Sequence, residues 1–371
     1  MKALSGESAG ADLPRGILTW SEALAPEVFR FQREAYPSRR PDWIEPRWRW
    51  MFLGSAERLG VAPFVWVYRN RAGVVAHQGA IAVRVRIGGR EHVTGWFVET
   101  MALESVRGKA IGPMLVAKAR ADLPFNLSLG QTPQMRELQF KLGWTQVTPL
   151  DTYVYVLNAP RVLAGKIANP VLRSLGAMGL TAAQRLRRGR GRRRPSPRHE
   201  ARPVARFGPQ HDRLWERVGR QYPCAVIRDA SYLNWKYVDQ PGQDFRRIEL
   251  ALDGTPVGVA ALLVSEPDDV YRYRRGFIVD LVVPPEDPNV VQMLLDESVE
   301  ALRRAGADLV VFDLAHPKLA RCARAFGFTP RGATRYFLIS TEGLDAESQA
   351  AAENPDNWLI TMGDSDIDRP W

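Results

Sequence analysis

A short loop between a predicted strand and a predicted helix carries the residues best suited to chemistry. It runs from Glu104 to Gly112 with the sequence ESVRGKAIG, and an apolar helix is expected over residues 113–121. Small residues before a helix leave several backbone N–H groups unpaired at the positive end of the helix dipole. Arg107 and Lys109 add positive charge at the rim. The loop is therefore predicted to bind a phosphate or pyrophosphate, and the alternative is a tight turn with surface charges.

Other residue types that could do chemistry are sparse. The five histidines are scattered without metal-ligand spacing, and the two cysteines, Cys224 and Cys322, do not form a metal-binding motif or a disulfide framework. The cysteines also have no nearby base in the sequence that would activate a thiol. We therefore expect no metal site and no cysteine nucleophile.

The elements that position the loop occur twice. Four landmarks recur in order at offsets between 181 and 185 residues: Trp50-Met51-Phe52 with Trp235-Lys236-Tyr237, Gly95–Glu99 with Gly276–Asp280, Thr132-Pro133 with His316-Pro317, and Leu142–Trp144 with Phe326–Phe328. Four matches in the same order indicate an internal repeat.

The two copies share one predicted element order, β-β-β-α-β-α-β. In the first copy we expect strands at 64–68, 74–85, 96–103 and 125–129; in the second, strands at 247–252, 257–264, 277–283 and 308–314 and a helix at 289–305. Thr132 and His316 each precede a proline at a predicted first helical position. The predicted fold class is α/β of the α+β type, with two tandem domains that each form a mixed, mostly antiparallel sheet flanked by helices.

The basic charge of the chain is concentrated in one segment. The net charge is +10, and residues 185–206 hold ten arginines against a single acid, Glu200. Glycine and proline are interspersed, so a disordered linker is predicted over 187–206. We divide the chain into a first domain (1–158), a helix and arginine-rich linker (159–206), a second domain (207–340) and a C-terminal tail (341–371).

Residues 159–185 have apolar residues near helical spacing with basic residues between them, interrupted at Pro170. Such a helix either packs on its own domain or lies on an anionic membrane. The linker could also contact RNA phosphates. The longest apolar run, Val257–Val264, is far shorter than a membrane span, and no signal peptide is visible. A cytoplasmic location is predicted, with peripheral contact at the inner membrane face as the alternative.

The tail from Trp358 to Trp371 contains three alternating aspartates, Asp364, Asp366 and Asp368. An EF-hand would require a glutamate further along, which is missing. We expect these charges to be solvated, although the apolar residues around them favour docking of the tail on a domain.

The motif Arg107-x-x-Ala110-x-Gly112 resembles the signature of the GNAT acetyltransferase superfamily, and Leu142-Gly143-Trp144 resembles the turn that closes the last helix of that fold. The resemblance covers about residues 41–158 and extends more loosely to 206–339, as in tandem GNAT proteins. One departure is Ala110, where the signature has glycine.

That resemblance implies acetyl-CoA, or another acyl-CoA, as co-substrate and a small amine or sugar-like molecule as acceptor, without a metal. The binding residues would be the strand positions Met101 and Leu103 for pantetheine and the loop for the pyrophosphate: Arg107, Gly108, Lys109, Ala110, Ile111 and Gly112.

The resemblance also implies roles in catalysis. Glu99 would be the general base. The position of the usual tyrosine acid is taken by Phe140, which cannot donate a proton. Either Tyr153 or Tyr155 on the following strand is then the acid, with Tyr153 as the candidate, or the thiolate leaves unaided. In the second copy, Pro284–Asn289 replaces the cradle with prolines and acids, and no cofactor is expected there.

Two other functions are compatible with the pattern. One is a Fem-type aminoacyl-tRNA-dependent transferase, which also pairs two GNAT-like domains and would use the arginine linker to contact RNA. The other is a non-catalytic module that binds CoA. The presence of the Arg107–Gly112 signature favours the CoA-dependent acyltransferase over the Fem-type transferase, whereas Ala110 and Phe140 are the features that favour the non-catalytic module.

Overall fold

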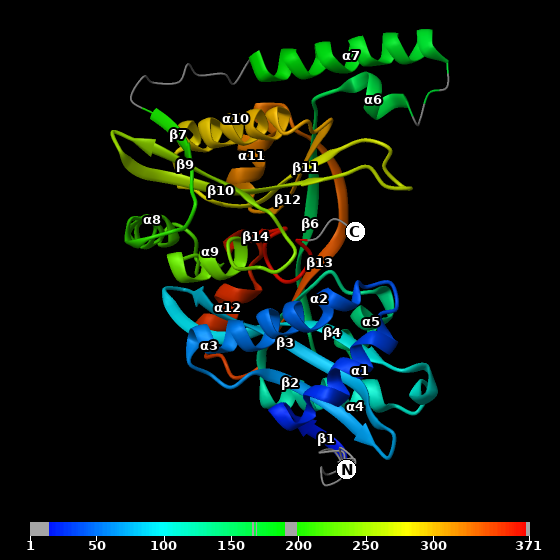
Figure 1. Cartoon of the computed structure of the whole chain (residues 1–371). Coiled ribbons are helices and arrows are strands. Elements are labelled where there is room, and N and C mark those ends of the chain that lie inside the picture. Colours follow the sequence, from blue (N-terminus) through cyan, green and yellow to red (C-terminus); the bar gives the residue numbers. More distant parts are fainter. Residues whose placement is uncertain (1–14, 165–166, 168, 190–198, 369–371) are drawn as a thin grey trace, which may run out of the picture.

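The computed structural model describes residues 15–164, 167, 169–189 and 199–368. Part of the predicted linker (190–198) and the last three residues of the predicted tail (369–371) lie outside these ranges. Within them the chain forms one mixed sheet of fourteen strands with helices packed against it. Figure 1 shows two stacked halves, the first coloured blue to cyan and the second yellow to orange.

The first half begins with β1 (Gly16–Thr19), which pairs with β2, and the helices α1 (Ala25–Ala35), α2 (Pro41–Trp48) and α3 (Ser55–Leu59). Between α2 and α3 the backbone adopts a π-helical turn at Arg49–Gly54. The predicted repeat then follows as β2 (Phe64–Asn70), β3 (Gly73–Ile87), β4 (Arg90–Ala102), α4 (Ile111–Asp122), β5 (Phe125–Leu129), α5 (Pro133–Lys141) and β6 (Thr145–Val156).

The second half repeats this order after α8 (Pro209–Gly219), β8 (Cys224–Val226) and α9 (Ala230–Tyr237). Its elements are β9 (Arg246–Leu252), β10 (Thr255–Ser265), β11 (Arg275–Val282), α10 (Pro288–Arg304), β12 (Leu309–Ala315), α11 (Pro317–Phe326) and β13 (Thr329–Thr341). The predicted strands and helices of both copies are thus confirmed to within a few residues. Pro133 and Pro317 lie at the predicted helix starts, and the residues before them are caps: Thr132 accepts a hydrogen bond from Met135 N–H at 3.2 Å and His316 from Leu319 N–H at 3.3 Å.

The prediction of two separate sheets is wrong, because each half lends its last strand to the other. Strand β13 pairs with β5, and β6 pairs with β12, while β6 and β13 also pair antiparallel with each other. In Figure 1 these two long strands run between the halves. Hairpin signals in the sequence specify only neighbouring strands, so this exchange of distant strands had no local signal. The division of the chain into domains stays a prediction.

Two equivalent tryptophans of the repeat meet where the halves join. Trp50 and Trp235 stack with ring centroids 4.8 Å apart and planes 14° from parallel. The Trp50 Nε1–H donates to the Trp235 carbonyl at 2.8 Å, and the Trp235 Nε1–H donates to the Trp50 carbonyl at 3.1 Å. Reciprocal contact between equivalent residues is the pattern of a two-fold symmetric interface, here within a single chain.

The segment between the halves is more ordered than predicted. Helix α6 (Ala159–Ala164) and helix α7 (Pro170–Gly189) replace the single predicted helix, with Pro170 at the start of the second. The prediction of disorder through residue 206 is wrong at its end, because β7 (His199–Pro203) pairs antiparallel with β9.

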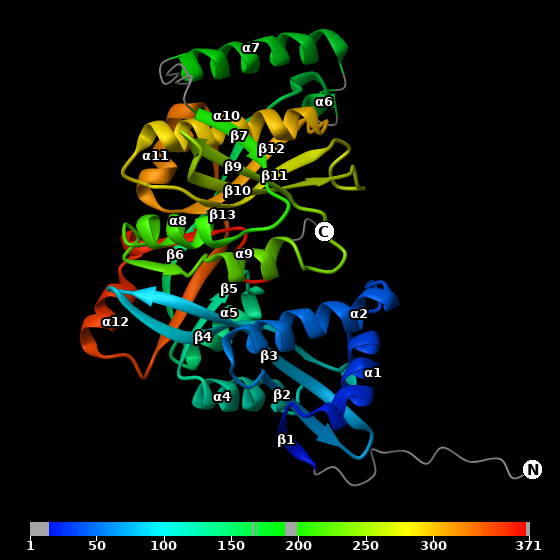
Figure 2. The same ribbon diagram turned by 60° about the vertical axis from the view of Figure 1, so that its left-hand side comes forward.

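Figure 2 shows α7 at the end of the molecule far from α4. It exposes four apolar side chains at helical spacing, Val171, Leu172, Leu175 and Met178. Among the described helices, none combines the length and the hydropathy that crossing a bilayer requires. Contact of residues 159–206 with an anionic membrane or RNA stays a prediction.

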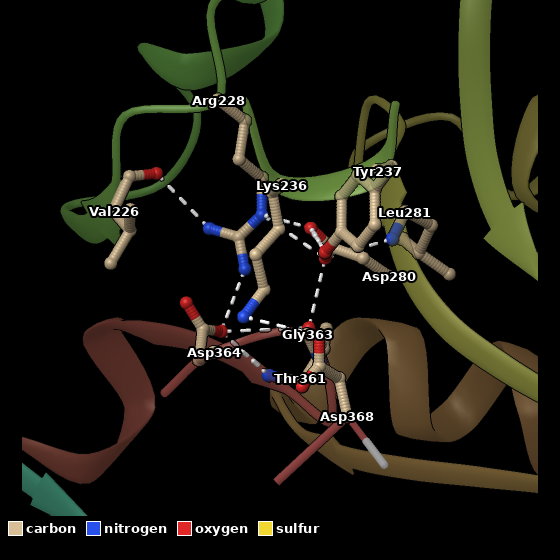
Figure 3. Close-up of polar contacts among 10 residues, drawn as sticks. All are labelled: Val226, Arg228, Lys236, Tyr237, Asp280, Leu281, Thr361, Gly363, Asp364 and Asp368. Atoms are coloured by element: carbon tan, nitrogen blue, oxygen red, sulfur yellow. Dashed lines mark hydrogen bonds and ion pairs between the residues drawn. The ribbon is translucent and has the colours of Figure 1, made fainter. Parts of the chain in front are cut away.

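The chain ends in α12 (Ala346–Glu353), which contacts β3 and β13, and in β14 (Trp358–Thr361), which pairs with β8 and β12. The prediction of solvated charge in the tail is wrong for Asp364 and Asp368, which are fully buried. They lie in a network that Figure 3 shows: Arg228 contacts Asp280 at 3.0 Å and Asp364 at 2.7 Å, and Lys236 contacts Asp368 at 3.2 Å. The alternation of charges in the sequence could not reveal partners that lie more than a hundred residues away.

The buried cap His316 makes the stability of the fold sensitive to acid. Burial lowers its pKa from 6.5 to about 4. Because the unfolded chain takes up the proton first, the stabilisation is complete above about pH 6.5 and is lost as the pH falls toward about 4. We expect the free energy of unfolding, measured by urea denaturation between about pH 7.5 and 5, to fall less steeply in His316→Asn, which keeps a capping side chain. If the free energy of unfolding fell equally steeply with pH in the native chain and in His316→Asn, His316 would not be the source of the acid sensitivity.

Candidate functional site

The site is built where β4 and β5 separate. These parallel strands pair only at Trp96 with Leu127 and at Phe97 with Ser128. Beyond that point β5 continues beside β13, and β4 continues beside β3. The edge of β4 that faces β5 is therefore left without a strand partner in the described chain, so that an extended ligand could pair with it.

The loop that follows β4 leaves its amides available. Gly108 and Ala110 both have positive φ angles, 79° and 58°, which turn the backbone into α4. Among the described residues, the N–H groups of Gly108, Ala110, Ile111 and Gly112 donate no hydrogen bond. A methyl group added at Gly108 or Gly112 would meet nothing within 4 Å. The loop thus has unpaired donors and open space, which fit a pyrophosphate.

The charged residues of the loop lie at its surface. Arg107 and Lys109 are exposed and contact only backbone carbonyls, those of Ala102 at 3.4 Å and Ser105 at 3.0 Å. Both can turn toward an anion bound at the helix start. Met101 is half-buried on the free part of β4, whereas the Leu103 N–H already donates to the Val75 carbonyl at 2.9 Å. The Leu103 amide is therefore not available to pantetheine.

The equivalent helix in the second half is closed to an anion. Asp287 caps α10 and accepts hydrogen bonds from the N–H groups of Asn289 at 3.0 Å and Val290 at 3.2 Å. The N–H groups at the start of this helix are therefore already bonded to a carboxylate. This capping supports the prediction that the second copy binds no cofactor.

Glu99 lies in a β-bulge of β4. The register between β3 and β4 shifts here, and Glu99 has a φ of 53°, a conformation that is uncommon for a residue with a side chain. The bulge interrupts, at Glu99, the regular alternation of side chains between the two faces of β4. The Glu99 side chain is 3% exposed, and its Oε1 contacts Arg39 Nη1 at 2.7 Å.

A buried histidine supports this bulge. His77 on β3 is fully buried, and its Nε2 accepts a hydrogen bond from Trp48 Nε1–H at 3.1 Å. The Nδ1 must then carry the proton, and it donates to the Glu99 carbonyl at 3.0 Å. Burial lowers the pKa of His77, which favours this neutral form. His77 therefore holds the strained backbone at Glu99.

Glu99 also lines a cavity of about 360 Å³. Its walls come from the turn after α1, from α2 and the π-helical turn, and from Pro241 and Gln243 of the second half. The cavity has a size usual for small-ligand sites. In the second half, the residue equivalent to Glu99 is Asp280, which is 1% exposed and enclosed by Arg228, Tyr237 and Thr361. The tail thus fills the place that is hollow in the first half.

Tyr153 is not brought to Glu99. It lies on β6 between Phe312 of β12 and Pro330 of β13, is 1% exposed, and accepts a hydrogen bond from Arg324 at 3.1 Å. Burial raises its pKa, although Arg324 acts against this. Tyr153 is not among the residues that line the cavity. The reason is the exchange of strands, which carries β6 into the second half.

A larger hollow of about 550 Å³ lies in the second half, between β6, β11, β12 and β13. It contains none of the predicted site residues. The two cysteines are buried and burial raises the pKa of both thiols, that of Cys224 to about 12. The described residues contain no cluster of three or more side chains that could hold a metal.

Arg39, Arg47, Trp48 and His77 were not predicted from the sequence. They belong to the turn after α1, to α2 and to β3 and form no motif, so that only their position around Glu99 identifies them. The π-helical turn at Arg49–Gly54 was the one local feature typical of a functional site, but it has no reliable sequence signal.

The split between β4 and β5, followed by an open helix start, is the architecture of the GNAT fold, and comparison with solved structures shows that this chain has it. A probable N-acyltransferase from Enterococcus faecalis V583 superposes with a TM-score of 0.61 at 10% identity, covering 87% of this chain and 71% of that one. A GCN5-related N-acetyltransferase from Anabaena variabilis gives 0.59 at 11% identity, with the same coverage.

Saccharomyces cerevisiae N-myristoyltransferase with bound myristoyl-CoA gives a TM-score of 0.55 at 12% identity, covering 96% of this chain and 92% of the enzyme. At the level of sequence alone, neither a family model nor a curated protein matches the chain. The comparisons therefore establish the fold.

Proposed function

We propose that this protein is an acyltransferase that uses an acyl-CoA, in the simplest case acetyl-CoA, to acylate a small amine or sugar-like acceptor. The observation that carries the proposal is the set of four unpaired amides at Gly108, Ala110, Ile111 and Gly112, beside the free edge of β4. The loop would hold the pyrophosphate, and the β4 edge at Met101 would hold the pantetheine. Solved structures with the same fold that bind myristoyl-CoA support this placement.

Acyl-CoA supplies a thioester whose carbon–sulfur bond breaks as the new carbon–nitrogen bond forms. Glu99 would accept the proton that the attacking amine loses, because its carboxylate lines the cavity where an acceptor can enter. Arg39 holds one carboxylate oxygen in place. The leaving CoA thiolate would take up its proton from solvent, since Tyr153 is not in the cavity and Phe140 lacks a donor.

Calorimetry with acetyl-CoA tests the cofactor site. We expect the native chain to bind, and Arg107→Glu to weaken binding about tenfold or more, because one attractive charge at the pyrophosphate becomes repulsive. Arg220→Glu makes the same charge change at an exposed position on the second half and should bind like the native chain. Equal affinity of all three proteins, or no binding to any acyl-CoA, would reject the proposed site. Binding without turnover on any amine would favour the non-catalytic alternative.

A further inference from the structure

Arg47 is a buried cation with two unpaired N–H groups. It lies on α2, is 7% exposed, and has no salt bridge among the described residues. With the Gln240 amide turned to satisfy its own hydrogen bonds, Arg47 Nη1 donates to Gln240 Oε1 at 2.9 Å. Its guanidinium carbon lies 5.5 Å from the centre of the Trp50 ring. The Nε and Nη2 atoms, however, donate to no described residue.

Two unpaired N–H groups on a buried charge are costly. Burial accordingly lowers the pKa of Arg47, against the attraction of Asp368, Asp366 and Glu99. The guanidinium still carries its charge, because an arginine does not lose its proton in a protein. A ligand with two acceptor oxygens would complete these hydrogen bonds.

The unpaired edge of the guanidinium, formed by Nε and Nη2, has the geometry of an anion receptor. Nε–H and Nη2–H lie side by side in the guanidinium plane and match the two oxygens of a carboxylate. Arg47 lines the same cavity of about 360 Å³ as Glu99. One ligand of small size can therefore reach both residues.

The other charged side chains that line the cavity, Arg39, Arg40 and Glu99, are paired. Arg39 contacts Glu99 at 2.7 Å, and Arg40 contacts Asp42 at 2.7 Å. Asp368 is engaged by Lys236 at 3.2 Å. Arg47 thus provides the positive charge that remains for a ligand.

The rest of the lining is mostly apolar, with Ser38 and Gln243 as its uncharged polar side chains. Trp43, Ile44, Trp48 and Met51 contribute large hydrophobic side chains. An acceptor that consisted only of hydroxyl groups, such as a sugar, would leave both this surface and the guanidinium edge unsatisfied.

We infer that the acceptor is an amine that also carries a carboxylate on an apolar body, with the carboxylate bound by Arg47 Nε and Nη2 and the amine directed to Glu99. The assignment of the amine to Glu99 rests on the proposed acyl transfer. The carboxylate site at Arg47 does not, since it follows from burial and geometry alone.

Calorimetry without CoA tests the carboxylate site. The probes are phenylalanine, 3-phenylpropionate, phenylalanine amide and 2-phenylethylamine, which share a ring and differ in the carboxylate and the amine. We expect the two carboxylates to bind at least about tenfold more tightly than the two compounds without one, since a buried charge would otherwise stay unpaired. In Arg47→Met, which keeps the apolar volume, this preference should disappear.

Arg86→Met is the matched control. Arg86 is also a partly buried arginine of the first half, but it pairs with Glu91 at 3.5 Å and does not line the cavity. We expect this variant to keep the preference for carboxylates. Thermal melting reports whether Arg47→Met folds. Arg47→Lys retains the positive charge but loses the two parallel N–H donors, so its preference for carboxylates should be intermediate.

Equal affinity for the four probes, no binding of either carboxylate, or an unchanged preference in a folded Arg47→Met would overturn the inference. These outcomes are separate from failure of the proposed function, which is measured by acetyl-CoA binding to the loop. A chain that binds acetyl-CoA but ignores carboxylates would retain the proposed function and lose only the acceptor assignment.

Discussion

Replacing Arg228 by methionine is expected to lower the free energy of unfolding by about 3–5 kcal/mol, the usual cost of removing one partner from a buried ion pair. Arg228 is 0% exposed and contacts two carboxylates, Asp280 and Asp364, which are 1% and 0% exposed. Without the guanidinium both would be left as buried charges. Burial already raises the pKa of Asp364, which Arg228 opposes.

The loss should be global rather than local. Figure 3 shows that Arg228, Asp280 and Asp364 come from three separate parts of the chain, the segment before α9, β11 and the tail. Tyr237 also donates to Asp280, at 2.8 Å. Releasing the tail would therefore expose the buried strand β14 and the interior of the second half.

Urea denaturation followed by tryptophan fluorescence measures this effect. Arg90→Met serves as the control, because Arg90 pairs with Asp345 and Glu347 through a side chain that is 58% exposed. Pairs of this kind contribute little to stability. If Arg228→Met were as stable as Arg90→Met, the network would not hold the tail.

Replacing Glu99 by glutamine is expected to lower kcat by about 10²–10⁴. Glutamine has nearly the same size but cannot accept a proton, so that the amine would attack without a base. Affinity for acetyl-CoA should be retained, because the side chain lies in the cavity and the amides of the pyrophosphate loop are unchanged. A loss in kcat with constant CoA affinity would therefore identify a chemical role.

The control for this variant is Glu91→Gln on the same strand. Glu91 is 46% exposed, pairs with Arg84 and Arg86, and does not line the cavity. Its activity should match the native chain. Should Glu99→Gln turn over acetyl-CoA at the native rate with a carboxylated amine, Glu99 would not be the base.

The open amides of the loop before α4 could be predicted because their information is local. Glycines, a preceding strand and a following apolar helix lie within about 20 consecutive residues, and each has a conformational preference of its own. The caps at Thr132 and His316 were predictable for the same reason, since a capping side chain bonds an amide three residues away. The internal repeat supported the predicted strands and helices, because the same local patterns occur in both copies.

The cavity could not be predicted in this way. Arg39, Arg47 and Glu99 are separated in sequence, and Pro241 comes from the other half. The bulge at Glu99 depends on His77 and Trp48, which lie on different elements. No periodicity distinguishes Arg47, a buried arginine without a salt bridge, from the exposed arginines around it.

The sequence by itself determined the order of strands and helices, the helix caps and the open amides before α4, because these depend on interactions between close neighbours. Only the tertiary structure decided that β6 and β13 exchange halves, that the tail buries Asp364 and Asp368, and that Arg47 and Glu99 face one cavity. Those outcomes depend on which distant surfaces exclude water together and which buried charges find partners, and these conditions are set by the packing of the whole chain.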